Sequence, residues 1–575
     1  MNIFLNYKKK FLKYLLSLKK KKIIDFPEDI KNLTVEISPK EQSSDMSCNV
    51  AMLLSKYNNK APIDLADKLK EHFKEDFNEF QDVKSARPGF LNFSFKSEFW
   101  KKYIIEILKQ DSKFGIDNSS KVNYNLEFVS ANPTGPMHVG HCRGAILGDV
   151  IANLLKFNGN KVHKEYYVND YGGQIRNFVQ SVYYRILEIK EDKKFPDDKD
   201  LYPGNYIIDI AEKILKEKKI KNFSNFDKIY NSLSVESLNS SIKLIKKNLK
   251  DLGIRHDIFV KESQLIKKKL VTKVIDKLKK NNHVYTGKLE APKGESDKNW
   301  KSRDLLLFRS TKFGDDADRV IQKEDKSWTY FANDIAYHSY KIDRKFDVLI
   351  NILGADHAGY IKRIKAAVKA ISNNKVELIC KVSQLVKLSK EGKPFKMSKR
   401  KGDYITAEDL LNEVGKDSVR FIMLNRSNDV ELDFDFQKVT EKSKENPVFY
   451  VQYAYARINS IFRLINLDID KYKINKDFDF DLNNHELEIL RKISEWPKCI
   501  EMSYKKLEPH RIPYYLYDLS TLFHSYWNMG KENKSYRFIQ DGKIKNNSRL
   551  TLLKAISIVI QNGMSILGVS TPKSM

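Results

Sequence analysis

Residues 124–168 read YNLEFVSANPTGPMHVGHCRGAILGDVIANLLKFNGNKVHKEYYV. The apolar run over 124–129 predicts a buried strand, and the Pro- and Gly-containing segment 132–135 predicts a turn after it. We expect a helix from there to about Phe157, with Gly159 as its stop, and a second strand over 162–168. The order of strand, helix and strand predicts a parallel sheet with helices on its faces.

Two histidines, His138 and His141, lie at the predicted start of this helix. Unsatisfied backbone N–H groups and the helix dipole favour an anion there, and both imidazoles can donate hydrogen bonds to phosphate oxygens. Gly140, between them, has no side chain and would let an adenine ring approach the backbone. These features predict a triphosphate site, although a pair of histidines that only caps the helix gives the same pattern.

Polar residues also follow a second apolar strand, predicted over 346–353. Gly354, Asp356 and His357 come directly after it, and ligands of doubly wound sheets bind at the carboxyl ends of the strands. The basic segment KPFKMSKRKG, residues 393–402, follows, and its ammonium groups could neutralise the charge of a leaving pyrophosphate. Since the chain contains 103 Lys and Arg residues, a solvated lysine loop is the alternative.

The two motifs together resemble the signatures of class I aminoacyl-tRNA synthetases. Residues 138–141 (HVGH) are similar to the HIGH sequence of that class, and residues 396–400 (KMSKR) to its KMSKS sequence, with an arginine in place of the last serine. The segments 127–133 (EFVSANP), 328–337 (WTYFANDIAY) and 446–454 (NPVFYVQYA) look like those of arginyl-tRNA synthetases in particular.

This resemblance spans about residues 85–570 and implies an arginine–tRNA ligase. Such an enzyme activates L-arginine with ATP to arginyl-adenylate and transfers it to the 3′-terminal ribose of tRNA(Arg) in translation. The residues to which it assigns catalysis are His138, His141, Lys396 and Lys399. The residues that it assigns to ATP, which would carry Mg2+, are His138, Gly140, His141, Gly354, Asp356, Lys396, Met397, Ser398 and Lys399.

Recognition of arginine requires carboxylates, because its planar guanidinium offers five N–H donors in a fork that a lysine head cannot match. Acidic residues near strand ends are therefore candidates, although each taken alone is more simply explained as a surface or capping carboxylate. The resemblance assigns six residues to arginine: Glu127, Ser130, Asn132, Tyr330, Asp334 and His357. Of these, Glu127, Tyr330 and Asp334 are expected at the guanidinium and the others at the amino-acid end or adenylate.

The expected fold is a multidomain α/β protein with a Rossmann-type catalytic domain. Residues 1–115 form a small N-terminal α/β domain, for which the resemblance implies contacts to the tRNA elbow. Residues 116–445 form the catalytic domain, with a connective insertion over about 173–329. Residues 446–575 predict amphipathic helices, and the resemblance implies an all-α anticodon-binding domain.

Composition limits the setting of the protein. The net charge of +28 favours a polyanionic partner such as RNA, with a lysine-rich genome as the alternative cause. Four separated cysteines without CxxC spacing suggest neither disulfides nor protein-bound zinc, and we expect no metal ligands. We see no apolar run near the roughly 20 residues that cross a bilayer and no signal peptide, so we expect a cytoplasmic protein without a membrane span. The resemblance favours a monomer.

Two other functions fit parts of this pattern. A non-catalytic tRNA-binding paralogue would keep the scaffold but lose the motifs, whereas both histidines and both motif lysines are present. A class I synthetase for glutamate would need a basic pocket, and one for cysteine would usually need zinc. The acidic candidates Glu127 and Asp334 favour arginine over both.

Overall fold

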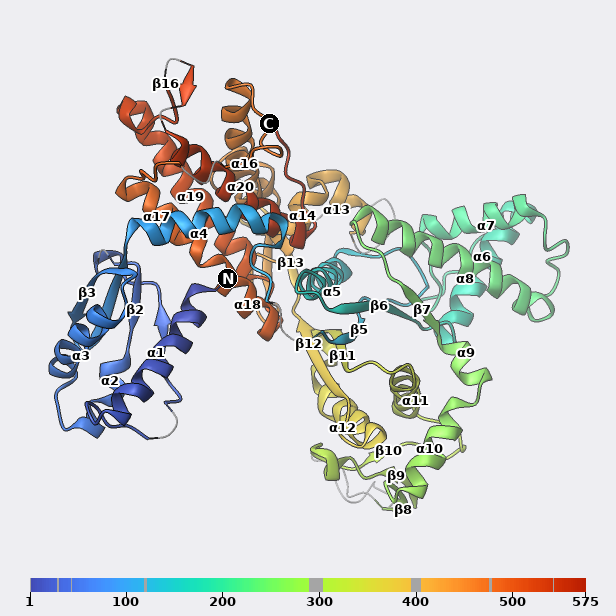
Figure 1. Ribbon diagram of the computed structural model, residues 1–575. Helices are drawn as coiled ribbons and strands as arrows, with labels where there is room; N and C mark the ends of the chain where they lie inside the picture. Colours follow the sequence, from blue (N-terminus) through green and yellow to red (C-terminus); the bar gives the residue numbers. More distant parts are fainter. Residues whose placement is uncertain are drawn as a thin grey trace. The chain divides into compact units, whose positions relative to one another are not determined.

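The computed structural model describes residues 2–27, 30–42, 44–117, 121–288, 304–394, 405–474, 478–540, 542–544 and 546–575. The chain divides into two compact units (Figure 1). One contains residues 120–440, and the other combines residues 1–119 with 441–575. The predicted ATP contacts Lys396, Met397, Ser398 and Lys399 lie outside the described residues.

A five-stranded parallel sheet forms the centre of the unit 120–440, in the order β12-β11-β5-β6-β7. Its strands are β5 (Asn123–Glu127), β6 (Lys161–Val168), β7 (Ile258–Lys261), β11 (Val348–Gly354) and β12 (Glu377–Ser383). At the end of β5, Glu127 pairs in register with Asn351 of β11 and Glu165 of β6. The parallel sheet confirms the predicted fold class, and β7 adds a strand from within the segment expected as an insertion.

Helices cover both faces of this sheet, as Figure 1 shows. The helix α5 (Val139–Phe157) connects β5 to β6, whereas α12 (Ile361–Ser372) connects β11 to β12 in the opposite direction, so right-handed crossovers place them on opposite faces. The helix α11 (Tyr330–Asp343) packs beside α12 in one apolar core. At Gly148 of α5, an added Cβ would lie 2.3 Å from the ring of Phe128, so close packing of helix on strand requires glycine there.

The remaining elements of this unit surround the sheet. A helical group with its own apolar core consists of α6 (Gly173–Glu191), α7 (Asn205–Glu217) and α8 (Phe226–Asp251). After β7 come α9 (Glu262–Lys267), α10 (Leu270–Lys280), and an antiparallel sheet of β8 (Val284–Gly287), β9 (Leu305–Phe308) and β10 (Arg319–Val320), with η4 (Ser310–Phe313). After β11 and β12 the elements are η5 (Ala355–Tyr360), β13 (Val386–Lys390), β14 (Lys393–Pro394), α13 (Ala407–Val414), α14 (Lys416–Met423), β15 (Leu432–Asp435) and α15 (Phe436–Thr440).

The N-terminal part of the other unit is a small α/β domain. Its four-stranded antiparallel sheet has the order β1-β2-β4-β3, with β1 (Val35–Glu36), β2 (Met46–Cys48), β3 (Phe80–Ala86) and β4 (Phe90–Phe95). Its helices are α1 (Ile3–Lys20), η1 (Lys40–Gln42), α2 (Val50–Leu54), η2 (Lys56–Asn58), α3 (Pro62–Asp76), α4 (Ser97–Gln110) and η3 (Asp111–Lys113). Phe11, Phe73 and Phe93 meet ring against ring in its core, which joins α1 and α3 to the sheet.

The C-terminal part of this unit is helical. It contains α16 (Pro447–Leu464), α17 (Asn484–Ser494), α18 (Trp496–Lys506), α19 (Arg511–Glu532), η6 (Lys534–Tyr536), the short strands β16 (Ile539–Gln540) and β17 (Lys543–Ile544), and α20 (Asn547–Leu567). The expectation that no run is apolar and long enough to cross a membrane is wrong for α20, which meets both criteria. Its most apolar window is 89% buried among α4, α16, α17 and α19, and a helix that is apolar all round is typical of such a core position.

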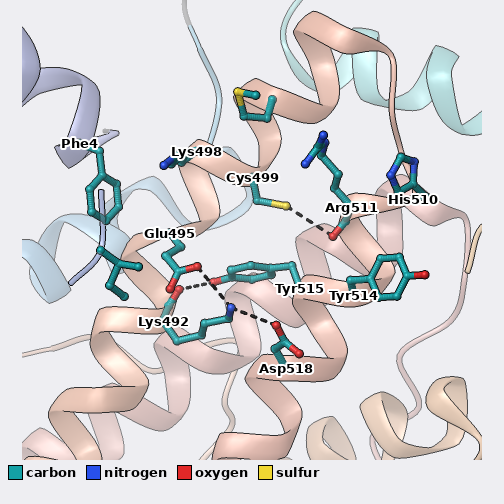
Figure 2. A pocket seen from close by; sticks show the side chains of 12 residues that line it. Phe4, Lys492, Glu495, Lys498, Cys499, His510, Arg511, Tyr514, Tyr515 and Asp518 are labelled. Atoms are coloured by element: carbon teal, nitrogen blue, oxygen red, sulfur yellow. Dashed lines mark hydrogen bonds and ion pairs between the residues drawn. The ribbon is translucent and has the colours of Figure 1, made fainter. Parts of the chain in front are cut away.

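Polar contacts join the N-terminal and C-terminal parts of this unit, and a cavity lies between them. Arg491 of α17 forms an ion pair with Asp45, and the Trp496 indole donates 2.9 Å to the backbone carbonyl of Phe114. Figure 2 shows a cavity of about 390 Å³ between Phe4 of α1 and the helices α18 and α19. Its Lys492 contacts Glu495 and Asp518, its Lys498 contacts Glu36, and its Arg511 contacts Glu508. Because these cations have acidic partners, the cavity has no evident attraction for a charged ligand.

Candidate active site

The two motif histidines form a reciprocal cap at the start of α5. His138 is the N-cap residue, and its Nδ1 accepts from the backbone N–H of Gly140 at 3.1 Å. In return, the backbone N–H of His138 donates to Nδ1 of His141 at 3.3 Å, and the two ring centroids lie 3.7 Å apart. A Cβ at position 140 would lie 2.9 Å from the His138 ring, so glycine leaves the room that this ring occupies.

Burial keeps both rings uncharged. Burial lowers the pKa of His138. Burial and the neighbouring His138 ring, which would repel a second positive charge, lower the pKa of His141 to about 4. Since each Nδ1 accepts a backbone hydrogen bond, each neutral ring holds its proton on Nε2. The first backbone amides of α5 are already hydrogen-bonded, so the two Nε2–H groups and the helix dipole are the features that suit the oxygens of a phosphate group.

The segment that follows the lysine motif pairs with the histidine motif. The backbone N–H of Val139 donates to the Ile405 carbonyl at 3.0 Å, and that of Ala407 donates to the Met137 carbonyl at 2.8 Å. His138 and Thr406 form an isolated antiparallel bridge between these two bonds. Residues 405–407, which follow the second motif in the sequence, therefore lie at the start of α5 beside the first motif.

Strand β5 ends in a bend with an unusual backbone. Val129 has φ +71° and Ser130 has φ +43°, and a β-branched residue in the left-handed region is strained. The bend directs the Ser130 hydroxyl to Glu127 Oε1 at 3.1 Å, and the same hydroxyl accepts the backbone N–H of Tyr167 at 3.0 Å. Strain at this point holds the Glu127 carboxylate at the carboxyl edge of the sheet.

The second predicted carboxylate, Asp334, lies on α11 close enough to Glu127 to sense its charge. Tyr360 of η5 donates a short hydrogen bond to Asp334 Oδ2. Burial, together with the charges of Glu127 and Glu262, raises the pKa of Asp334 to about 7. Glu262 at the start of α9 is buried and accepts from the Asn333 amide at 3.2 Å. We call Glu127, Glu262 and Asp334 the acidic corner.

A buried network under the acidic corner was not predicted from the sequence. Lys341 of α11 is fully buried, and its Nζ donates to Glu127 Oε2 at 2.5 Å and to Asn351 Oδ1 at 3.2 Å. The Asn351 amide in turn lies 3.0 Å from Nε2 of His338, whose Nδ1 lies 2.8 Å from the backbone carbonyl of Asp334. Burial lowers the pKa of His338 to about 3, so this ring is a neutral member of the network.

The other predicted residues are more exposed. Tyr330 opens α11 one turn before Asp334 and is 81% exposed. Asn132 is exposed and donates to Gln174 at 2.8 Å. At the end of β11, Gly354 is exposed, and the side chains of Asp356 and His357 approach each other at 3.4 Å with most of their surface in solvent. They share the carboxyl edge of the sheet with Glu127 but form a separate, open part of it.

Sequence reasoning missed Glu262, His338, Lys341 and Asn351. Spacing offered one signal, because Asp334, His338 and Lys341 follow each other at helical intervals of four and three and so share one face of α11. Within the described parts of the chain, no group of three or more His, Cys, Asp and Glu side chains is arranged to hold a metal ion.

Comparison with known families accounts for most of the chain. Residues 103–463 match the family described as "tRNA synthetases class I (R), catalytic domain". Residues 7–95 match "Arginyl tRNA synthetase N terminal domain", and residues 451–575 match "DALR anticodon binding domain". These three matches follow one another along the sequence in the order expected for the predicted architecture.

Individual proteins give the same result. The chain is 56% identical over 577 residues to an arginine–tRNA ligase of Pelagibacter ubique (strain HTCC1062), with 100% of each chain covered. It is 42% identical to an arginine–tRNA ligase of Roseobacter denitrificans, with 96% of each covered. The fold is shared with the Thermus thermophilus arginyl-tRNA synthetase at a TM-score of 0.69 and 19% identity, over 97% of this chain and 98% of that one. The chain therefore belongs to the arginyl-tRNA synthetase family of class I aminoacyl-tRNA synthetases.

Proposed function

We propose that this arginine–tRNA ligase performs both steps of its reaction at the carboxyl edge of the five-stranded sheet. The observation that carries the assignment is the acidic corner beside the capped histidine helix. The acidic corner offers carboxylates for a guanidinium, and the two histidines offer N–H donors for phosphates. Both groups lie at the carboxyl edge of the same sheet. The comparisons supply the reaction, and the geometry supports a division of the site into an arginine side and an ATP side.

In the first step the carboxylate of arginine attacks the α-phosphorus of ATP in line. A bond forms between a carboxylate oxygen and phosphorus, and the bond to the β-phosphate bridging oxygen breaks, so that arginyl-adenylate and pyrophosphate result. We assign His138 and His141, each with its proton on Nε2, to the phosphates as charge moves during displacement. Lys396 and Lys399 are proposed for the leaving pyrophosphate, and Mg2+ enters as part of the ATP substrate.

Further contacts to ATP are proposed on the same edge. Gly140 is proposed for the adenine because it has no side chain, and Gly354 at the end of β11 and Asp356 just after it are proposed for the ribose. Met397 and Ser398 complete the proposed set beside the motif lysines. Catalysis in this scheme consists of positioning and electrostatic stabilisation, and no covalent bond to the protein forms.

Arginine recognition is assigned to the acidic corner. Glu127 and Asp334 receive the guanidinium, and Tyr330 covers it from the start of α11. A lysine head would leave carboxylate oxygens unpaired in this enclosed pocket, which costs more than an absent contact at the surface. Ser130, Asn132 and His357 are proposed for the amino-acid end of the substrate.

In the second step the terminal ribose 2′-hydroxyl of tRNA(Arg) attacks the carbonyl carbon of the adenylate, and AMP leaves. We propose that residues 1–115 contact the tRNA elbow, that about 173–329 includes contacts to the 3′ end, and that 446–575 binds the anticodon. On α16, Tyr450 and Tyr453 are partly exposed, whereas Tyr455 is buried.

A cationic aromatic cluster supports the anticodon assignment. Arg457 lies over the rings of Tyr453 and Trp527 at 4.1 and 5.1 Å, and His524 packs between Tyr450 and Tyr453. Aromatic rings that combine with an arginine are typical of surfaces on which single-stranded bases stack. We further propose a monomer that acts in the cytoplasm.

The test is pyrophosphate exchange into ATP, measured with each amino acid in turn, with and without tRNA(Arg). We expect exchange with arginine alone, stimulated by tRNA, and its loss in Lys399→Ala and Asp334→Ala. Absence of exchange under every condition, with tRNA binding intact, would instead indicate a non-catalytic tRNA-binding paralogue. Exchange that survives Asp334→Ala would remove that residue from the guanidinium site.

A further inference from the structure

Lys341 is unusual because it places a buried positive charge directly against a residue assigned to bind a positively charged substrate. Its side chain has no exposed surface, and its ammonium group lies 2.5 Å from Glu127 Oε2. An ammonium group in such surroundings is costly unless it is paired and hydrogen-bonded. Glu127 and Asn351 supply acceptors, and the ring of Tyr337 lies 4.5 Å below the charge.

The network that starts at Lys341 connects the two carboxylates of the guanidinium site. Lys341 donates to Glu127 on one side and to Asn351 on the other. Asn351 then reaches His338, and His338 reaches the backbone carbonyl of Asp334. Because neutral His338 can donate through Nδ1 and accept through Nε2, every contact in this series can have a matched donor and acceptor.

Charge is unevenly distributed around Glu127 and Asp334. The titratable groups around this pair come from several elements. They are Tyr337, His338 and Lys341 of α11, Glu262 of α9, Tyr167 of β6, Cys380 of β12 and Tyr360 of η5. Burial keeps His338 neutral. Lys341 is the cation whose charge lowers the pKa of Asp334, whereas Arg363 acts on Tyr360 and Lys365 acts on Cys380. Glu165 and Arg344 form their own ion pair at 2.7 Å and balance each other.

Resting on the function proposed above, we propose that Lys341 is a positioning residue for arginine: it balances Glu127 so that Glu127 and Asp334 can both meet the guanidinium ionised. Glu127 Oε2 takes the ammonium and Oε1 takes the Ser130 hydroxyl, and each oxygen keeps capacity for one further donor. Without Lys341 two carboxylates would share an enclosed site with no cation on Glu127, so the pKa of Asp334 would rise further and a larger fraction of it would retain a proton at neutral pH. A protonated carboxyl cannot pair with the charge of a guanidinium.

The test compares the KM for arginine in tRNA-supported pyrophosphate exchange between pH 6 and 9 for the wild type, Lys341→Met and Lys341→Arg. Lys341→Met should raise this KM by about tenfold or more at pH 7, and the difference should shrink toward pH 9 as the carboxyls ionise, since one pKa unit corresponds to tenfold. Lys341→Arg, which keeps the cation, should stay within about threefold of the wild type. The KM for ATP should not change.

Lys164→Met is the matched control. Lys164 is also buried, on strand β6 of the same sheet, and pairs with Asp149 at 3.0 Å, but Asp149 keeps Arg420 as a second partner. Its loss should lower the melting temperature and leave the pH profile for arginine unchanged. A merely structural role for Lys341 predicts the same behaviour in Lys341→Met, namely lower stability with an unshifted profile, and this result would overturn the proposal.

A second variant covers the case in which Lys341→Met does not fold. Asn351→Asp puts a competing carboxylate beside Lys341, so the arginine profile should shift in the same direction by a smaller amount, and an unshifted profile would again refute the proposal. Wild-type protein without arginine-dependent exchange at any pH would contradict the proposed function itself. That outcome is distinct from an active wild type with an unaffected Lys341→Met.

Discussion

Two carboxylates near each other in the sheet unit, Glu165 on β6 and Asp334 on α11, have opposite surroundings. Glu165 on β6 is fully buried and accepts from Asn125 at 2.9 Å, from Tyr337 at 2.6 Å and from Arg344 at 2.7 Å. Asp334 accepts from Tyr360 and faces two other acids, and burial raises its pKa to about 7. The first carboxylate already has its cation, whereas the second has a hydroxyl donor and acidic neighbours. We propose that this difference distinguishes a structural acid from a binding acid.

The largest expected effect is on activity with arginine, which should depend on Asp334 far more than on Glu165. Asp334→Asn should lower kcat/KM for arginine by about a thousandfold, because a site built to hydrogen-bond a substrate group loses strongly when the partner is removed. The variant should melt no lower than the wild type, since an enclosed carboxyl with a raised pKa opposes folding at neutral pH. Exchange kinetics and a thermal melt check both parts, and a large fall in melting temperature would argue that Asp334 is structural.

The next effect is a loss of stability with little change in arginine binding, the opposite of the result expected for Asp334→Asn. Glu165→Gln should destabilise the fold by about 3 kcal/mol, because it removes one member of a buried ion pair and leaves Arg344 without its carboxylate. Arginine KM in the surviving folded protein should change by less than about threefold. Denaturant unfolding measures the loss of stability, and exchange kinetics at a permissive temperature measure the KM for arginine. A selective loss of arginine binding with normal stability would make Glu165 a binding acid instead of a structural one.

A smaller effect is expected in the way the KM for arginine depends on pH. If arginine pairs with ionised Asp334 as proposed, the KM for arginine should be constant above about pH 7 and should rise by up to tenfold per unit as pH falls below 7. The sign follows from the raised pKa, since protonation at low pH removes the charge that the guanidinium requires. A profile that stays flat down to pH 5 would show that Asp334 does not titrate in this range.

Local patterns explain why part of this site could be predicted. The turn from β5 into α5 fixes where His138, Gly140 and His141 lie, because a helix N-terminus after a parallel strand has one location on the sheet. Glu127 was a candidate because it is an acid near a predicted strand end, and its family segment assigned it to the guanidinium; the structure ends β5 at this residue. Asp334 became a candidate through its family segment, and the structure places it near Glu127.

The rest depends on long-range packing. Lys341 and Asn351 meet only because α11 lies against β11, and a lysine in a chain with 103 basic residues gives no local sign that it is buried. Glu262 likewise enters the acidic corner from the segment expected as an insertion. Helix α20 was misjudged in the same way, since its apolar surface is explained by the helices that surround it rather than by its own sequence.

Proton release on arginine binding is the most direct test of the claim that Asp334 awaits a cation. Calorimetry of arginine binding at pH 7, in buffers with different ionisation enthalpies, should show about half a proton released per arginine, because a group with a pKa near 7 is about half protonated before binding. Release should fall toward zero at pH 8.5 and vanish in Asp334→Asn. Binding without proton release at pH 7, or release that persists in that variant, would contradict the account.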